Sequence, residues 1–430
     1  MNHDPSSNPT SVKRVVAASF VATAIEWYDF FLYGTAAALV FNRLFFPNAD
    51  PSVGILASFG TYAVGFFARP IGGVVFGHYG DRIGRKSVLI TTLMMVGLST
   101  FFIGLLPTYE TAGVLAPILL VLLRFVQGLG VGGQWAGAVL LVVEHGPAGK
   151  RGYHASWVQA GAPAGLLLAT GVFAIFSQMP EESFLSWGWR VPFLLGVLLT
   201  GIGLFLRMKV LETPVFAKAQ EAKPNEEMPL LEVLRKQPRN VLLAMGARMA
   251  ENAYYYFFTV FALTYATDTL GMPRAMVLNG VLVGAALQFG ANLFFGALSD
   301  RVGRRPVYLG GAIFLAAYIY PFFLLVELRT PAAIWIGIIV GMIGHAAMYG
   351  PQAAFLSELF GTRVRYTGAS LGYQLSSPLS GGLAPIIAYL LLDWSGGKPW
   401  PVALYLIGMA AITIVSVYLA TETSRSDLAE

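Results

Sequence analysis

The chain has 430 residues, of which 56% are hydrophobic and only 12% are charged. Soluble domains carry about 25% charged residues, so this composition excludes an ordinary soluble protein and indicates a chain that lies in a bilayer. The chain has no cysteine, which excludes a disulfide framework, a zinc finger and thiolate chemistry.

Twelve stretches are long and apolar enough to span a membrane, which takes roughly 20 residues each. We therefore predict an all-α integral membrane protein with twelve transmembrane helices. The expected spans lie near 15–40, 53–77, 86–106, 113–143, 153–177, 190–208, 240–267, 275–298, 307–327, 331–359, 367–392 and 400–420.

One long hydrophilic interruption, from Lys209 to Arg239, separates six spans from six spans. We interpret it as a cytoplasmic linker, 209–239, between an N-terminal half, 1–208, and a C-terminal half, 240–430. A short amphipathic helix is expected near 230–236. The polar start of the chain, residues 1–11, does not resemble a secretory signal peptide, so the first span is expected to serve as its own insertion signal.

The basic residues predict the orientation, because short cytoplasmic loops hold Lys and Arg in excess. With the N-terminus inside, twenty of the 28 basic residues lie on the cytoplasmic side, five lie outside and three lie within spans. We expect a multi-pass protein of the cell (inner) membrane with both termini cytoplasmic. Its basic side would face anionic lipid headgroups, which explains the net charge of +5 without a nucleic-acid partner.

A charged hairpin occurs twice, as G-H-Y-G-D-R-I-G-R-K at 77–86 and as G-A-L-S-D-R-V-G-R-R at 296–305. Each copy follows the second span of its half. Two hairpins in register indicate a duplicated chain whose two six-helix halves are related by pseudo-two-fold symmetry.

These hairpins in a twelve-span chain resemble the major facilitator superfamily, whose halves are parallel repeats. The runs I-E-W-Y-D-F-F-L-Y-G at 25–34, F-A-R-P-I-G-G at 67–73, R-F-V-Q-G-L-G-V-G-G at 124–133 and F-L-S-W-G-W-R-V-P-F at 184–193 resemble its metabolite:proton symporter family. The likeness is closest to the shikimate transporter branch. It implies a secondary active transporter, normally monomeric, that works by alternating access.

Each hairpin holds an Asp that can cap a helix N-terminus, and its arginines need acidic partners at the same depth. Glu144 and Glu358 occupy matching places in the two halves. We expect two ion-pair clusters that hold the cytoplasmic side shut; the alternative is that the charges only set the topology. The predicted gate residues are Asp81, Arg82, Arg85, Glu144, Asp300, Arg301, Arg304 and Glu358.

Six charged residues lie within spans, where each is costly unless it is paired or faces a cavity. They are Glu26, Asp29, Arg69, Arg124, Arg248 and Glu251. Helical spacing predicts four polar stripes that can line a shared central cavity. They are Glu26, Asp29 and Tyr33; Arg124, Gln127 and Gln134; Arg248, Glu251 and Tyr255; and His345, Tyr349 and Gln352.

A carboxylate in such a cavity can carry the coupled proton, because its proton affinity changes with its partners. The resemblance favours Asp29 with Arg124 as the coupling pair, with Glu26 and Glu251 as further candidates. The alternative is a permanent structural salt bridge. Arg69, which precedes Pro70 near the gate, remains ambiguous because it could replace Arg124 as the partner of Asp29.

Arginine binds carboxylates in bidentate fashion, so the cavity suits a small hydroxylated organic anion. We expect import of shikimate or a similar carboxylate with protons; di- and tricarboxylates such as 2-oxoglutarate or citrate, and osmolytes such as betaine or proline, are the alternatives. The candidate binding residues are Arg124, Arg248, Tyr33, Gln127, Gln134, Trp135, Gln159, Asn252, Tyr255, Gln288, Asn292, His345, Tyr349 and Gln374.

Two other classes of protein fit less well. An enzyme would need a nucleophile or metal set, and no H-E-x-x-H, C-x-x-C or G-x-S-x-G motif is present. We therefore expect no catalytic residue, metal or cofactor. A non-transporting membrane sensor remains an alternative, as does a uniporter, which would need no protonatable acid in its cavity.

Overall fold

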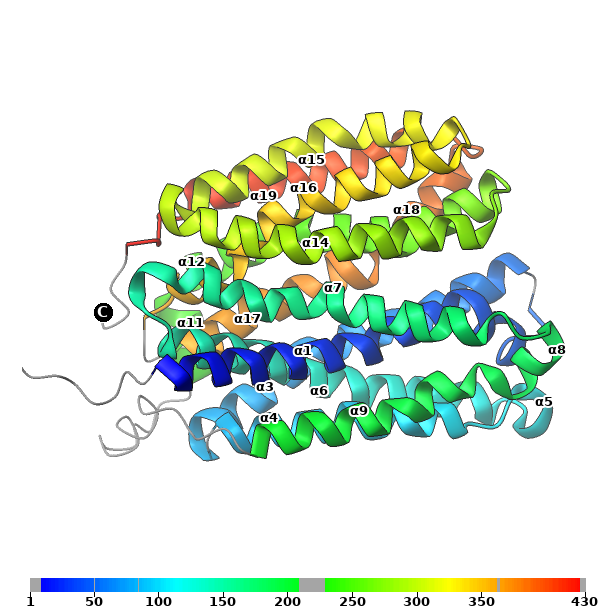
Figure 1. Cartoon of the computed structure of the whole chain (residues 1–430), viewed down its shortest axis with the longest axis horizontal. Helices are drawn as coiled ribbons and strands as arrows, with labels where there is room; N and C mark the ends of the chain where they lie inside the picture. The colour runs from blue at the N-terminus through cyan, green and yellow to red at the C-terminus, as the bar shows by residue number, and fades with distance from the viewer. Residues whose placement is uncertain (1–8, 50, 84, 209–228, 362–363, 426–430) are drawn as a thin grey trace, which may run out of the picture.

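The computed structural model describes residues 9–49, 51–83, 85–208, 229–361 and 364–425, and the side chains of residues 80–86 lie outside this description. Within these ranges the chain is helical and has no strand. The long helices run side by side along the long axis, and both ends of the described chain lie at the same end of the bundle (Figure 1). We call this the terminal end; α5 and α8 mark the opposite, distal end.

The long helices of the first half are α1 (Pro9–Ala36), α3 (Pro51–Ile83), α4 (Arg85–Leu105), α6 (Leu115–His145), α7 (Arg151–Phe176) and α9 (Arg190–Met208). The second half has α12 (Pro238–Tyr256), α14 (Arg274–Val302), α15 (Arg304–Glu327), α16 (Pro331–Glu358), α17 (Arg365–Ser377), α18 (Ala384–Trp394) and α19 (Trp400–Leu419). The short helices are α2 (Asn42–Leu44), α5 (Tyr109–Ala112), α8 (Glu181–Ser183), α11 (Pro229–Lys236) and α13 (Ala262–Thr264).

Ten helical segments of the described chain are long and apolar enough to cross a membrane. The pair Glu181–Gly188 and Arg190–Leu206, bent by 40°, would be an eleventh. The predicted span at 240–267 is not among them, because its helical run includes Arg248 and Glu251, which lower its hydropathy. The all-α membrane fold is confirmed.

Three of the predicted spans are interrupted by a π-helical turn. These turns are Ala37–Phe41 after α1, Phe257–Phe261 after α12 and Pro378–Gly382 after α17. Such turns inside a helix frequently mark functional sites, and the last two adjoin the polar residues described below.

Close helix packing explains the glycine-rich run of α6. A Cβ on Gly128 would lie 2.2 Å from the carbonyl oxygen of Gly65, and one on Gly72 would lie 2.0 Å from that of Leu129. Helices α3 and α6 therefore touch backbone to backbone, which brings Arg69 of α3 close to Arg124 of α6.

The expected linker, 209–239, is described only from residue 229 onward; residues 209–228 lie outside the described residues. Helix α11 occupies the place of the predicted amphipathic helix and ends the linker at the terminal end (Figure 1).

Candidate functional site

The second charged hairpin joins the two halves at the terminal end. Gly303, with φ of 109°, makes the turn between α14 and α15. The Asp300 carboxylate accepts hydrogen bonds from the backbone amides of Gly152 (2.8 Å) and Tyr153 (2.9 Å) in the first turn of α7. Asp300 caps a helix as predicted, but the capped helix belongs to the other half rather than to its own hairpin.

Arg304 holds this hairpin to α16. Its guanidinium group donates to both Glu358 oxygens at 3.2 Å, to Asp300 at 2.7 Å and to the Ser299 hydroxyl at 2.8 Å. The Arg304 and Glu358 side chains are fully buried. The predicted ion pair between these two residues is therefore present, and it is linked through Asp300 to α7.

The segment that follows α19 closes the cluster from the terminal end. Glu422 accepts hydrogen bonds from the backbone amides of Arg304 (2.9 Å) and Arg305 (3.0 Å), and the Thr423 hydroxyl donates to Glu358 (2.8 Å). Partial burial raises the pKa of Glu422, but the backbone hydrogen bonds from Arg304, Ser424 and Arg305 outweigh it and hold this pKa below its ordinary value. Sequence reasoning missed this segment because its partners lie 65 to 118 residues away along the chain.

The structure shows less of the other predicted gate residues. Asp81, Arg82 and Arg85 have side chains outside the described residues. Glu144 is half-buried near the end of α6. Arg301 follows Asp300 in α14, is exposed and forms no ion pair within the described part of the chain, so its role in the gate stays a prediction.

A buried polar chain links α4 and α6 in the first half. Arg124 donates to Gln127, and Gln127 donates to the Thr100 hydroxyl at 2.8 Å. Asp29 lies beside Thr100, since both side chains come within 3.1 Å of a Cβ built on Gly196. Among the residues that the structure describes, neither oxygen of Asp29 has a hydrogen-bond partner, and neither do Nε and Nη2 of Arg124.

The expected ion pair between Asp29 and Arg124 is not formed among the described residues. Arg124 instead lies over the rings of Phe30 (4.4 Å), Tyr33 (4.2 Å) and Tyr62 (4.9 Å). Both charged groups are fully buried. The structure thus places the Asp29 carboxyl group beside the polar chain that holds Arg124. Both groups keep hydrogen-bonding atoms without a partner among the described residues.

The second half has a matching but better satisfied network around Glu251. Its carboxylate contacts Arg248 at 3.4 Å and His345 at 3.3 Å, and accepts from Gln352 at 3.0 Å. His345 is in turn 2.7 Å from Gln288. The predicted stripes of α12 and α16 therefore face one another.

Arg248 is also held by α17. It donates to the Tyr373 carbonyl (2.5 Å) and the Ser377 hydroxyl (2.5 Å), and its guanidinium carbon lies 3.3 Å from the centre of the Tyr373 ring. Asn252 of the same helix donates to Ser380 at 3.0 Å.

Further side-chain contacts join the two halves. Trp135 stacks on Tyr373 at 3.7 Å and donates to Gln159 (3.0 Å). Gln159 donates to the Tyr349 carbonyl (3.2 Å), and Gln374 donates to the Gly132 carbonyl (3.1 Å). Several predicted binding residues thus make contacts between the two halves.

All the remaining predicted residues are buried in the bundle. The hydroxyls of Tyr33, Tyr255 and Tyr349, and the amide of Asn292, have no hydrogen-bond partner. Glu26 and Gln134 are buried and take part in further interactions.

Sequence reasoning missed an aromatic cluster between the halves. Phe66 of α3 lies 5.1 Å from both Phe30 and Tyr256, and Tyr62 lies 6.2 Å from Tyr256. The hydroxyls of Tyr62 and Tyr256 are buried and unpartnered. The run of three tyrosines and two phenylalanines at 254–258 is the signal that could have drawn attention to it.

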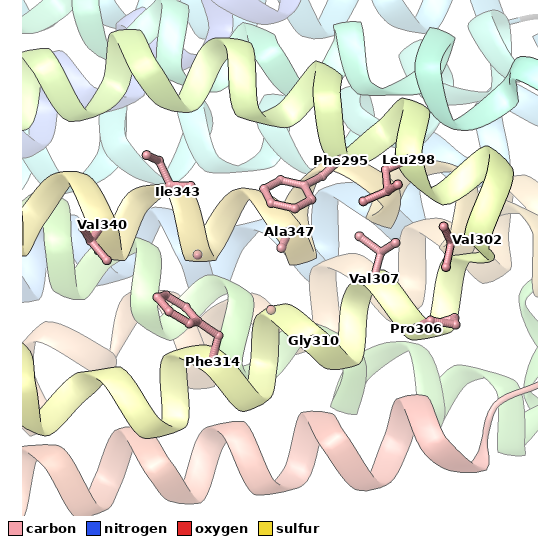
Figure 2. A pocket seen from close by; sticks show the side chains of 12 residues that line it. Phe295, Leu298, Val302, Pro306, Val307, Gly310, Phe314, Val340, Ile343 and Ala347 are labelled. Atoms are coloured by element: carbon pink, nitrogen blue, oxygen red, sulfur yellow. The ribbon is translucent and has the colours of Figure 1, made fainter.

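A large cavity of about 460 Å³ lies elsewhere, between α14, α15 and α16 (Figure 2). Its twelve lining residues, among them Phe295, Val307 and Phe314, are all apolar or glycine. It contains none of the candidate residues and is not part of the site. The described residues also hold no group of three or more His, Asp or Glu side chains arranged to bind a metal ion.

Known proteins resemble this chain over most of its length. The family model of the Major Facilitator Superfamily matches residues 19–377. The chain is 42% identical over 421 residues to the shikimate transporter of Escherichia coli (strain K12), covering 96% of this chain and 95% of that protein. It is 35% identical over 431 residues to the proline/betaine transporter of Salmonella typhimurium (strain LT2), covering 97% and 85%.

Among solved structures, the proton:xylose symporter XylE bound to 6-bromo-6-deoxy-D-glucose superimposes with a TM-score of 0.76 at 16% identity, covering 97% of each chain. The family match and the relatives named as transporters show a secondary active transporter rather than an enzyme. The chain belongs to the Major Facilitator Superfamily.

Proposed function

We propose that the protein imports a small organic acid, shikimate or a similar carboxylate, together with protons by alternating access. The observation that carries this proposal is that Asp29 and Arg124 are both fully buried and incompletely partnered, with Asp29 beside the Thr100 end of the polar chain that holds Arg124. Charges in such a place are costly unless a ligand or a proton completes them.

In this proposal Asp29 carries the proton. A buried carboxyl group without a cation or hydrogen-bond donor is least costly as the neutral acid. Approach of Arg124 or access to water would favour the ionised form and release the proton. Glu26 and Glu251 are the other candidate carriers; Glu251 is the weaker one, because Arg248, His345 and Gln352 already satisfy it.

The central residues would bind the anion. Arg124 would meet the carboxylate, and the unpartnered Tyr33, Tyr255 and Tyr349 hydroxyls would bind hydroxyl groups of the substrate. The name of the 42% identical relative supports shikimate as the first candidate, and that of the 35% identical relative supports proline or betaine as an alternative.

The hairpin cluster of Asp300, Arg304 and Glu358 would act as the gate at the terminal end, between halves 1–208 and 240–430. The excess of basic residues on this side supports a cytoplasmic position for this end of a protein in the inner membrane. The chain would function as a monomer.

Uptake of labelled shikimate into proteoliposomes with an imposed inward proton gradient tests the proposal, with 2-oxoglutarate, citrate and betaine as competitors. Accumulation above equilibrium that shikimate itself competes away supports it. If labelled shikimate does not accumulate, the three competitors are labelled and tested in turn. Accumulation of one of them would assign that alternative, and accumulation of none of the four would favour a non-transporting sensor.

A further inference from the structure

A second buried arginine lies beside Arg124 with no acidic partner. Arg69, directly before the helix-internal Pro70 of α3, is 1% exposed, and its Nε and Nη2 have no hydrogen-bond partner in the described part of the chain. No carboxylate of the described residues forms an ion pair with it. Arg69 therefore lies in the aromatic cluster between the halves and not at the hairpin gate.

Arg69 and Arg124 share one aromatic ring. The guanidinium carbon of Arg69 lies 4.2 Å from the centre of the Phe30 ring, and that of Arg124 lies 4.4 Å from the same centre. Arg69 also lies 4.5 Å from the centre of the Phe66 ring. Cation–π contacts recover only part of the cost of desolvating a cation, and two cations on one ring also repel each other.

Two tyrosine hydroxyls near the Phe30 ring also lack a hydrogen-bond partner among the described residues. Tyr62, which Arg124 overlies, and Tyr256, which lies 5.1 Å from Phe66, have buried hydroxyls without partners. Two guanidinium groups and two hydroxyls offer donors, and no anion of the described chain accepts from them. An exogenous anion would satisfy all four.

We propose that Arg69 is a second carboxylate-binding residue, and that one carboxylate of the substrate bridges Arg69 and Arg124. This rests on the proposed function and deepens it, because it assigns the feature that every accepted substrate must share. The ligand class is a small molecule with at least one ionised carboxylate.

The test is binding in detergent by isothermal titration calorimetry, with shikimate and its neutral carboxamide as probes, on wild type, Arg69→Gln, Arg69→Lys and Arg43→Gln. Arg43 is an exposed arginine paired with Glu181 at the distal end, so Arg43→Gln controls for loss of a charge. A thermal unfolding curve of each variant verifies that it is folded.

Wild type should bind shikimate at least about 30-fold more tightly than Arg69→Gln does, which is the usual effect of removing one partner of a buried charged contact. Arg69→Lys should recover part of the loss. The carboxamide should bind weakly and equally to wild type and Arg69→Gln, because the lost contact is specific to the charged group.

Two outcomes would overturn the proposal. If Arg69→Gln weakens shikimate and its carboxamide by the same factor, Arg69 supports the site only structurally. If Arg69→Gln binds shikimate as wild type does, Arg69 does not touch it. If wild type binds none of shikimate, 2-oxoglutarate, citrate or betaine, the proposed function itself fails and the inference with it.

Discussion

Asp300 caps the first turn of α7 by accepting a hydrogen bond from the backbone amide of Gly152, at 2.8 Å across the boundary between the two halves. The same carboxylate accepts from Arg304, whose guanidinium group also holds Glu358. One side chain thus ties the N-terminus of a helix in one half to an ion-pair cluster in the other.

Asp300→Asn should loosen this end of the bundle. Asn keeps one acceptor oxygen but loses the second one and the negative charge that faces the N-terminus of α7 and Arg304, a loss of about 1 kcal/mol that corresponds to a roughly fivefold shift between closed and open states. The chain lacks cysteine, so a single Ser156→Cys, buried against Gly296, reports the opening through its rate of thiol labelling. We expect about fivefold faster labelling in Asp300→Asn. The exposed Asp393→Asn is the control, and an equal rate in both variants would show that the cap does not hold the halves together.

Glu422 makes stability depend on pH in a predictable direction. Its pKa is lowered in the folded state, so its contribution is present above the unfolded value of about 4.3 and is lost as pH falls through the lower folded value. Glu422→Gln should lower the unfolding temperature at pH 7, and the difference from wild type should shrink below about pH 4. Thermal scans from pH 7 to pH 3 measure this, with the exposed Glu182→Gln as the matched control. A difference that grows on acidification would contradict the assignment.

The hairpin shows how far the sequence predicts this site. The repeated D-R-x-G-R motif correctly indicated a helix-capping Asp and an ion pair between Arg304 and Glu358. It could not show which helix is capped, because α7 and the α14–α15 hairpin meet only through the packing of the two halves. The N-terminus of α15 is capped instead by Glu422, which no local pattern connects to it.

The polar stripes, like the helices, were predictable from the helical period of the sequence. Spacing of three and four residues correctly grouped Arg124 with Gln127, and Arg248 with Glu251. Spacing does not show what faces a stripe, so the expected pair of Asp29 and Arg124 was not found and the aromatic surroundings of Arg69 were missed.

The buried pair of Glu251 and Arg248 allows a role in stability to be distinguished from a role in proton coupling. Removing one partner of a buried ion pair destabilises a protein by about 3–5 kcal/mol, whereas replacing both by apolar groups of similar size is often neutral. We therefore expect Glu251→Ala to lower the unfolding temperature strongly and the double variant Arg248→Met, Glu251→Met to recover most of the loss. A double variant that unfolds as early as Glu251→Ala would show that the pair is not the main source of stability.

Asp29→Asn should separate coupling from transport. The variant keeps the shape of the side chain and cannot ionise, so we expect it to equilibrate shikimate across the membrane but not to accumulate it under an imposed proton gradient. Counterflow of labelled shikimate in proteoliposomes measures the first property, and gradient-driven uptake measures the second. Full accumulation by Asp29→Asn would move the proton site to Glu26 or Glu251.

Coupling between proton and substrate is the central claim, and it is tested most directly in the reverse direction. Proteoliposomes that contain a pH-sensitive dye receive an inward shikimate gradient with no proton gradient and with the membrane potential clamped. The account predicts that the lumen acidifies as shikimate enters, and that no acidification occurs in Asp29→Asn. Shikimate entry without any change of internal pH would contradict it and identify a uniporter.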